Sequence, residues 1–184
     1  MELGNILTTV LENLAKLLPV RIVKENEQAV RWTLGKAGPN LDAGWYLFVP
    51  LAQSIDIVNI TIGPLELHEQ LVGTEDKQQC TIVSGLVWKV NDARKYLIHI
   101  GDEDSARNLY IVARGVISEV IRPKQYDLLR TDQNRVERDI TDRLRNKVKE
   151  WGMYIERVHI SEYPNNVRAF RHYGIAHNET GAIV

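Results

Sequence analysis

Five histidines and one cysteine are the residues of this sequence best able to bind a metal or act as a nucleophile: His68, His99, His159, His172, His177 and Cys80. Their spacing matches neither the His-Glu-x-x-His pair nor the Cys-x-x-Cys framework of zinc sites. His68 and His159 fall in runs of alternating polar and apolar residues, which predicts strand positions rather than metal ligands. Cys80 lies in a long β-type run with no histidine beside it, so we expect a small buried strand residue.

Two short runs resemble ligand-binding loops until their spacing is compared. Residues 101–105 are acidic but are not followed by the glycine at the sixth position and the glutamate at the twelfth position of a calcium loop, so they predict a helix start capped by Asp102 or Asp104. Residues 35–40 are glycine-rich but lack the spacing of a phosphate-binding loop, and their composition predicts a plain loop. No Gly-x-Ser-x-Gly elbow is present. We therefore predict no catalytic residue, no cofactor-binding residue and no metal ligand, and a protein that is not an enzyme.

The composition is that of an ordinary soluble globular chain. It has 184 residues, of which 44% are hydrophobic and 26% charged, with a formal net charge of −1. This charge gives no reason to expect nucleic acid as a partner. The single cysteine cannot form an internal disulfide, and no signal peptide or apolar run long enough for a membrane span is visible. We expect a protein that stays in the cytoplasm.

The first segment predicts an amphipathic helix over residues 3–18 that ends at Pro19. Its apolar stripe follows the i, i+3, i+4, i+7 spacing and consists of Leu3, Ile6, Leu7, Val10, Leu11, Leu14, Leu17 and Leu18. The helix is too short to cross a bilayer but could lie in its interface. It could equally pack on its own domain or on a neighbouring subunit. These eight residues are the predicted contacts with a membrane or a partner.

The remaining elements change from strands to helices near residue 90. Six β-type runs cover residues 20–24, 28–34, 45–50, 55–62, 65–72 and 79–90. Helices are then predicted for residues 92–98, 105–121 and 131–150, the last with Thr131 as its N-cap. The apolar face of the second helix comprises Leu109, Ile111, Val112, Val116, Ile117 and Val120, and that of the third comprises Val136, Ile140, Leu144 and Val148. Gly152 should end the third helix in a left-handed conformation before a final strand over residues 153–160.

This order of elements, with the motifs placed on it, resembles the SPFH domain, also called the band 7 or prohibitin-homology domain, of stomatins, prohibitins and flotillins. The matching pieces are Gly35-Lys36 after a strand, residues 43–50, residues 74–76, residues 88–92 and Trp151-Gly152. Ala43 replaces the proline of the second piece. Further matches in the helical part and the last strand are Leu128, Leu129, Arg135, Ile140, Leu144, Ile155, Val158 and Ile160.

The resemblance implies an α+β fold in which an antiparallel β-half is followed by helices packed on it and by a closing strand. We expect the amphipathic helix at residues 1–18, the SPFH-like domain at residues 19–163 and a polar tail at residues 164–184. The family usually has a membrane hairpin or span before the domain and a long coiled coil after it. Here the former is reduced to the helix at residues 3–18 and the latter is missing, so we expect a short form.

The resemblance implies one function, and the compact domain, the missing coiled coil and the lack of a true membrane segment favour a second. The first is a non-catalytic, homo-oligomeric scaffold, peripheral on the membrane, that organises the membrane or controls access to membrane proteins such as a protease. The second is a soluble structural subunit of a ring or particle, for example a viral particle, that uses residues 1–18 as a docking arm. No cofactor is expected in either case.

Overall fold

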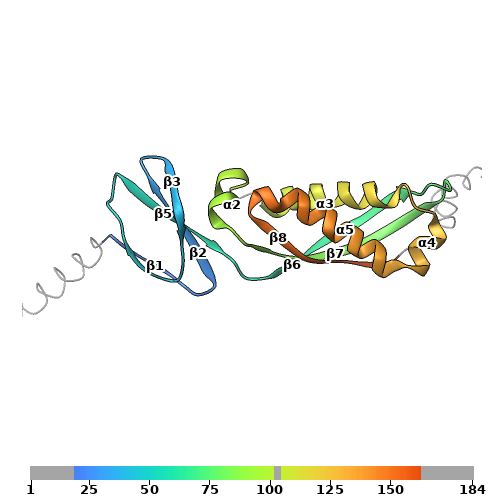
Figure 1. Ribbon diagram of the computed structural model, residues 1–184, viewed down its shortest axis with the longest axis horizontal. Coiled ribbons are helices and arrows are strands. Elements are labelled where there is room, and N and C mark those ends of the chain that lie inside the picture. The colour runs from blue at the N-terminus through green and yellow to red at the C-terminus, as the bar shows by residue number, and fades with distance from the viewer. Residues whose placement is uncertain (1–18, 102–104, 163–184) are drawn as a thin grey trace, which may run out of the picture.

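The period-two patterning up to residue 90 produces seven antiparallel strands in the structure, a computed structural model that describes residues 19–101 and 105–162. Helices and one closing strand follow, so the predicted α+β class is confirmed (Figure 1). The strands before the helices are β1 (Val20–Val23), β2 (Glu27–Thr33), β3 (Lys36–Leu41), β4 (Gly44–Leu47), β5 (Gln53–Asn59), β6 (Gly63–Gly73) and β7 (Gln79–Val90). After them come α2 (Ala93–His99), α3 (Ser105–Ile121), α4 (Tyr126–Thr131), α5 (Gln133–Val148), the 3-10 helix η1 (Lys149–Trp151) and β8 (Met153–Glu162).

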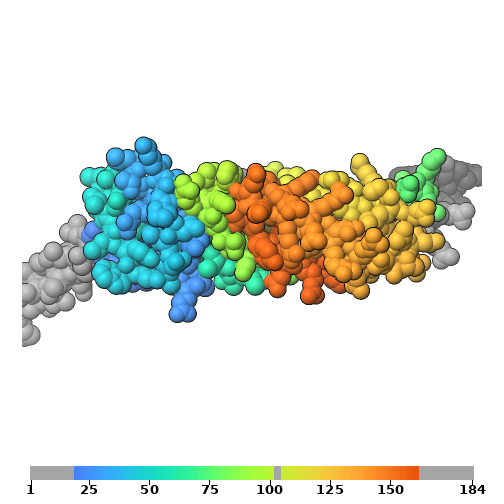
Figure 2. All heavy atoms as spheres, in the orientation of Figure 1, coloured from blue at the N-terminus to red at the C-terminus, as the bar shows by residue number. Residues whose placement is uncertain are grey.

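The first five strands form a separate end of an elongated molecule (Figures 1 and 2). Strands β1 and β4 pair as a two-stranded ribbon, and β3, β2 and β5 form a three-stranded sheet in that order. A small core of Val23, Ala29 and Ile55 lies between the ribbon and this sheet. This end of the molecule therefore consists of two thin β layers.

The expected loop at residues 35–40 was wrong, because Lys36–Leu41 is strand β3. Leu34 and Gly35 have φ angles of 50° and 78° and form a two-residue turn between β2 and β3. Positive φ at both central residues is the geometry that matches the twist of a tight hairpin. Pro39 is tolerated because β3 is an edge strand of its sheet. The turn-forming residues of this segment thus predicted a loop, although most of them belong to strand β3 of a hairpin.

The second sheet carries the main core. Its strand order is β6-β7-β8, all antiparallel, and α3 and α5 lie together on one of its faces (Figure 1). The predicted inward face of α5 is confirmed, since Val136, Ile140, Leu144 and Val148 are all buried. On α3 the prediction was wrong for Ile111, whose side chain is 58% exposed because the buried stripe runs through Ala113 instead.

The start of α5 also differs from the prediction. Thr131 does not cap it, because its hydroxyl donates to the carbonyl oxygen of Asp127 inside α4, at 2.9 Å. Residues 126–131 form a separate short helix, α4, and Asp132 separates α4 from α5 without a side-chain cap. At the other end, Gly152 has φ 74° and ends the helical segment as predicted.

The two parts of the molecule are joined at the N-terminus of α2. The backbone N–H of Ala93 donates to Oε1 of Gln28 at 3.0 Å, and that of Arg94 donates to Oδ1 of Asn40 at 2.8 Å. Asp92 caps the same helix, accepting from the N–H of Lys95 at 3.1 Å. Side chains of β2 and β3 thus satisfy the free N–H groups of a helix in the other part.

Candidate functional site

The eight predicted contact residues all precede Pro19 and lie outside the described residues: Leu3, Ile6, Leu7, Val10, Leu11, Leu14, Leu17 and Leu18. The structure therefore does not test this prediction. None of the helices within residues 19–101 and 105–162 has the length and hydropathy of a membrane-spanning segment. The described residues do contain another candidate contact surface.

Such a surface is present on the β1–β4 ribbon. Val20 pairs with Leu47 and Ile22 pairs with Trp45, and residues directly opposite in an antiparallel pair project from the same face. All four side chains are exposed, with Ile22 at 68% and Trp45 at 70%. One whole face of the ribbon is therefore apolar and uncovered by other described residues.

Two neighbouring turns extend this face. Val49 and Leu51 follow β4, and Leu51 is fully exposed on a backbone with φ 74°. Leu34, at the tip of the β2–β3 hairpin, lies close by because its N–H donates to the carbonyl oxygen of Ala52 at 2.9 Å. We call the set of seven exposed side chains the ribbon patch: Val20, Ile22, Leu34, Trp45, Leu47, Val49 and Leu51.

The opposite face of the ribbon is fixed to the sheet beneath it. Val23 is buried in the small core, and Tyr46 packs against that core while its hydroxyl donates to the carbonyl oxygen of Asp42 at 2.8 Å. Nη2 of Arg31, on β2, donates to the carbonyl oxygen of Leu47 at 3.3 Å. The outward direction of Trp45 and Leu47 is thus set by packing behind them.

Sequence reasoning missed the ribbon patch although it identified both strands. β1 reads Val-Arg-Ile-Val and β4 reads Gly-Trp-Tyr-Leu, so both strands carry apolar residues on both faces and the sequence does not show which face is buried. Only the pairing of β1 with β4, instead of with β2, brings Ile22 and Trp45 together on an outer face. One feature of the sequence could have indicated an exposed apolar surface here: the apolar run of residues 45–49 continues past Pro50 to a further apolar residue, Leu51.

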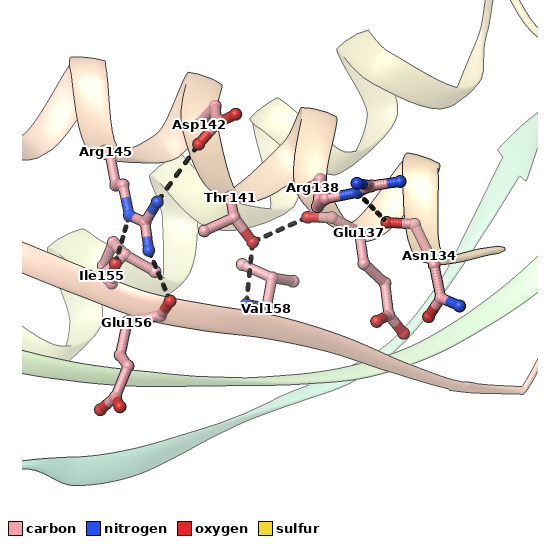
Figure 3. Close-up of polar contacts among 9 residues, drawn as sticks. All are labelled: Asn134, Glu137, Arg138, Thr141, Asp142, Arg145, Ile155, Glu156 and Val158. Carbon is pink, nitrogen blue, oxygen red and sulfur yellow. Dashed lines mark hydrogen bonds and ion pairs between the residues drawn. The ribbon is translucent and has the colours of Figure 1, made fainter.

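A polar groove lies between α5 and β8 and is a second candidate site (Figure 3). Arg145 reaches from α5 to the outer edge of β8, where Nε donates to the carbonyl oxygen of Ile155 and Nη2 to that of Glu156, both at 2.6 Å. Nη1 donates to Asp142 at 3.2 Å. All three nitrogens of this guanidinium are engaged by the protein itself.

Thr141 is engaged in the same way. Its hydroxyl accepts from the N–H of Val158 at 3.0 Å and donates to the carbonyl oxygen of Glu137 at 2.7 Å. A hydroxyl whose proton is held by a backbone carbonyl is poorly placed to act as a nucleophile. The side chains of Arg145 and Thr141 therefore occupy the hydrogen-bonding groups at the outer edge of β8, and this prevents the backbone of β8 from pairing with another strand.

His172 and His177 lie outside the described residues, and the other histidines and Cys80 do not form a common site. Cys80 is buried, its thiol donates to the carbonyl oxygen of Val72 at 3.4 Å, and burial with the nearby Asp76 charge raises the pKa of that thiol. His159 contacts Glu137 at 3.1 Å, and His68 stacks edge-on against Tyr110 with ring centroids 5.8 Å apart. Within the described residues, no three His, Cys, Asp or Glu side chains gather as a metal site would require. Cys80 is thus the small buried strand residue that the sequence predicted.

Comparison with known proteins gives a consistent assignment. The family model for the SPFH domain / Band 7 family matches residues 21–171. Stomatin of Mus musculus is 23% identical over 145 residues, covering 78% of this chain and 50% of that protein. Stomatin-4 of Caenorhabditis elegans is 19% identical over 145 residues, covering 78% and 51%. An uncharacterized protein of Archaeoglobus fulgidus is 21% identical over 154 residues, covering 83% and 61%. The chain thus spans about half the length of the two stomatins.

Proposed function

The chain belongs to the SPFH domain / Band 7 family, and from that premise we propose that it is a non-catalytic scaffold held at the surface of a membrane. Within this proposal it is peripheral on the cytoplasmic side, forms homo-oligomers, and organises the membrane or controls access to membrane proteins, a protease among them. The division into residues 1–18, 19–163 and 164–184 stays a prediction. The observation that carries the proposal is the ribbon patch.

The ribbon patch has the composition of a surface that is buried when the protein binds a membrane or a partner. Monomeric soluble proteins seldom expose contiguous apolar surface of this kind without a binding role. Burying one large apolar side chain contributes about 1.5–3 kcal/mol, so a few such residues suffice for measurable partitioning. Trp45 adds an aromatic ring of the type enriched at membrane–water interfaces.

The test is flotation of the full chain with neutral phosphatidylcholine vesicles. The double variant Ile22→Glu with Trp45→Glu places two charges on the ribbon patch, and we expect its recovery with vesicles to fall at least about tenfold. Its matched control is Ile98→Glu with Ile111→Glu, two exposed isoleucines on the helices, which should float like the unchanged chain. Equal recovery of the unchanged chain and the ribbon variant would contradict the proposed membrane surface.

A chain that begins at Pro19 tests the role of residues 1–18. If it still floats, and loses flotation with the ribbon substitutions, the ribbon patch is a sufficient membrane contact. If only the full chain floats, the apolar stripe of residues 3–18 is the anchor, and the ribbon patch is not. If neither floats, the membrane proposal fails and the soluble ring or particle subunit takes its place.

A further inference from the structure

The sheet β6-β7-β8 has two faces, and the described helices cover one of them. Leu67, Ile82, Leu86, Val158 and Ile160 point into the core beneath α3 and α5. The alternate positions point the other way. On the central strand these are Val83, Gly85, Val87 and Lys89. We call this second surface the open face, and among the described residues no helix packs on it (Figure 1).

The central strand has the composition of a strand covered on both sides. Beside its core positions, β7 carries Val83, Gly85 and Val87 on the open face, where a solvated sheet would carry polar residues. All three are only half-buried. Gly85 leaves room for close approach, since the nearest atom to a Cβ added there would be a backbone oxygen at 3.7 Å. An apolar centre of this kind favours another sheet as its cover.

The flanking strands carry opposite charges. In one row of the register Glu66, Gly85 and His159 lie side by side across the sheet. In the next row the order is Pro64, Val87 and Arg157. At these rows the β6 side of the open face thus carries the carboxylate of Glu66 and the β8 side the guanidinium of Arg157, whereas His159 contacts Glu137 of α5 at 3.1 Å. Neither Glu66 nor Arg157 belongs to an ion pair formed by the described residues.

We propose that the open face binds the open face of a second copy of this chain, with a two-fold axis running along β7. This arrangement stacks the Val83, Gly85 and Val87 strip of one copy on that of the other. It also places β6 over β8, so that Glu66 of each copy faces Arg157 of the other. A two-fold axis across the strands would instead place β6 over β6 and bring like charges together, which is unfavourable.

A contact through the face is also favoured over one through the strand edge at β8. There the side chains of Thr141 and Arg145 already bond outer backbone groups of the strand (Figure 3), and so does the side chain of Gln133. A second copy could add a strand only after breaking these bonds. This dimer contact rests on the proposed function, because it specifies how the homo-oligomer forms. Its test needs no membrane, so the dimer contact can fail while the membrane proposal holds, and the reverse.

The first test is sedimentation equilibrium of the full chain in detergent-free buffer. Val87→Glu buries a charge in the contact and should weaken dimerisation at least about tenfold. Glu66→Arg and Arg157→Glu should each weaken it, and the two together should restore it, because the charges are then exchanged. The matched controls Ile111→Glu and Arg107→Glu, on the outside of α3, should leave dimerisation unchanged.

The second test uses the symmetry of the contact. Because the axis runs along β7, residue 87 of one copy faces residue 87 of the other. Val87→Cys should therefore form an intermolecular disulfide when diamide oxidises the two thiols, whereas Ile111→Cys should not. The inference is overturned by a monomer at all concentrations, by a dimer that Val87→Glu leaves intact, or by failure of the double charge exchange to restore it. If the chain is a monomer, the open face is either exposed to solvent or covered by residues 163–184.

Discussion

The backbone N–H of Asp92 donates to the carbonyl oxygen of Gly152 at 3.0 Å, and this bond holds the start of α2 against the end of η1. The N–H of Asn91 donates to the same oxygen at 2.8 Å. Because Gln28 and Asn40 cap α2 from the first part of the molecule, this contact also fixes that part relative to the helices. Gly152 thus ends the helical segment and also holds the start of α2 through its carbonyl oxygen.

Replacing Gly152 by alanine should destabilise the fold by more than about 2 kcal/mol. The residue has φ 74°, and a Cβ there would collide with the carbonyl oxygen of Asp92 and with Cβ of Lys95. The matched control is Gly115→Ala on α3, where nothing lies within 4 Å of the added Cβ. We expect that variant to be more stable by about 0.5–1 kcal/mol, since alanine favours a helix. Urea unfolding followed by circular dichroism measures both, and equal stability of the two variants would contradict the argument.

The joint at Asp92 should make stability depend on acidic pH. Burial acts to raise the pKa of Asp92, but hydrogen bonds from Asn40 and from the N–H of Lys95, with the Lys95 charge, lower it below its ordinary value of 3.8. The unfolded chain then takes up the proton more readily, so the stabilisation is complete above the ordinary pKa and is lost as pH falls through the lower folded value.

The variant Asp92→Asn isolates this effect. An asparagine can still cap α2 but does not titrate, so its urea midpoint should fall less between neutral pH and pH 3 than that of the unchanged chain. Glu119, whose pKa is also lowered through its bonds with Lys147 and Arg143, is common to both chains and cancels in the difference. Parallel pH curves for the two chains would show that Asp92 contributes nothing.

Removing the guanidinium of Arg145 should open the edge of β8. Arg145→Ala removes its bonds to the carbonyl oxygens of Ile155 and Glu156, and we expect a loss of about 2 kcal/mol in the free energy of unfolding. Arg138→Ala in the same groove removes one bond, to the carbonyl oxygen of Asn134 within its own helix, and should cost under about 0.5 kcal/mol. Hydrogen exchange of the β8 amides provides a second measurement, and protection unchanged by Arg145→Ala would refute the shielding role.

The thiol of Cys80 should react only slowly with thiol reagents while the protein is folded. The side chain has no exposed surface, and burial raises its pKa, so both access and thiolate formation are suppressed. Iodoacetamide labelling at pH 8 should be slow until urea unfolds the chain, and then rapid. Fast labelling of the folded chain would show that β7 opens locally, and would require Cys80→Ser as the background for the cross-linking test.

The sequence alone was enough to determine the order and the type of most elements. Period-two runs marked the strands, and i, i+3, i+4 stripes such as that of Val136, Ile140 and Leu144 marked the helix faces, because burial imposes these periods locally. The same patterns, together with Gly35-Lys36 and Trp151-Gly152, were enough to identify the family. Errors fell where a local signal was ambiguous, as at strand β3, where turn-forming residues sit inside a hairpin.

Only the tertiary structure decided which faces are left uncovered. β1 and β4 carry apolar residues on both of their faces, so either face could be the buried one, and strand pairing alone placed Ile22 beside Trp45 on the outside. In the same way, the register of β6, β7 and β8 brings Glu66 and Arg157 to one face although they lie far apart in the chain. Periodicity depends on near neighbours in sequence, whereas a surface depends on which distant strands pair, and that is set by the packing of the whole fold.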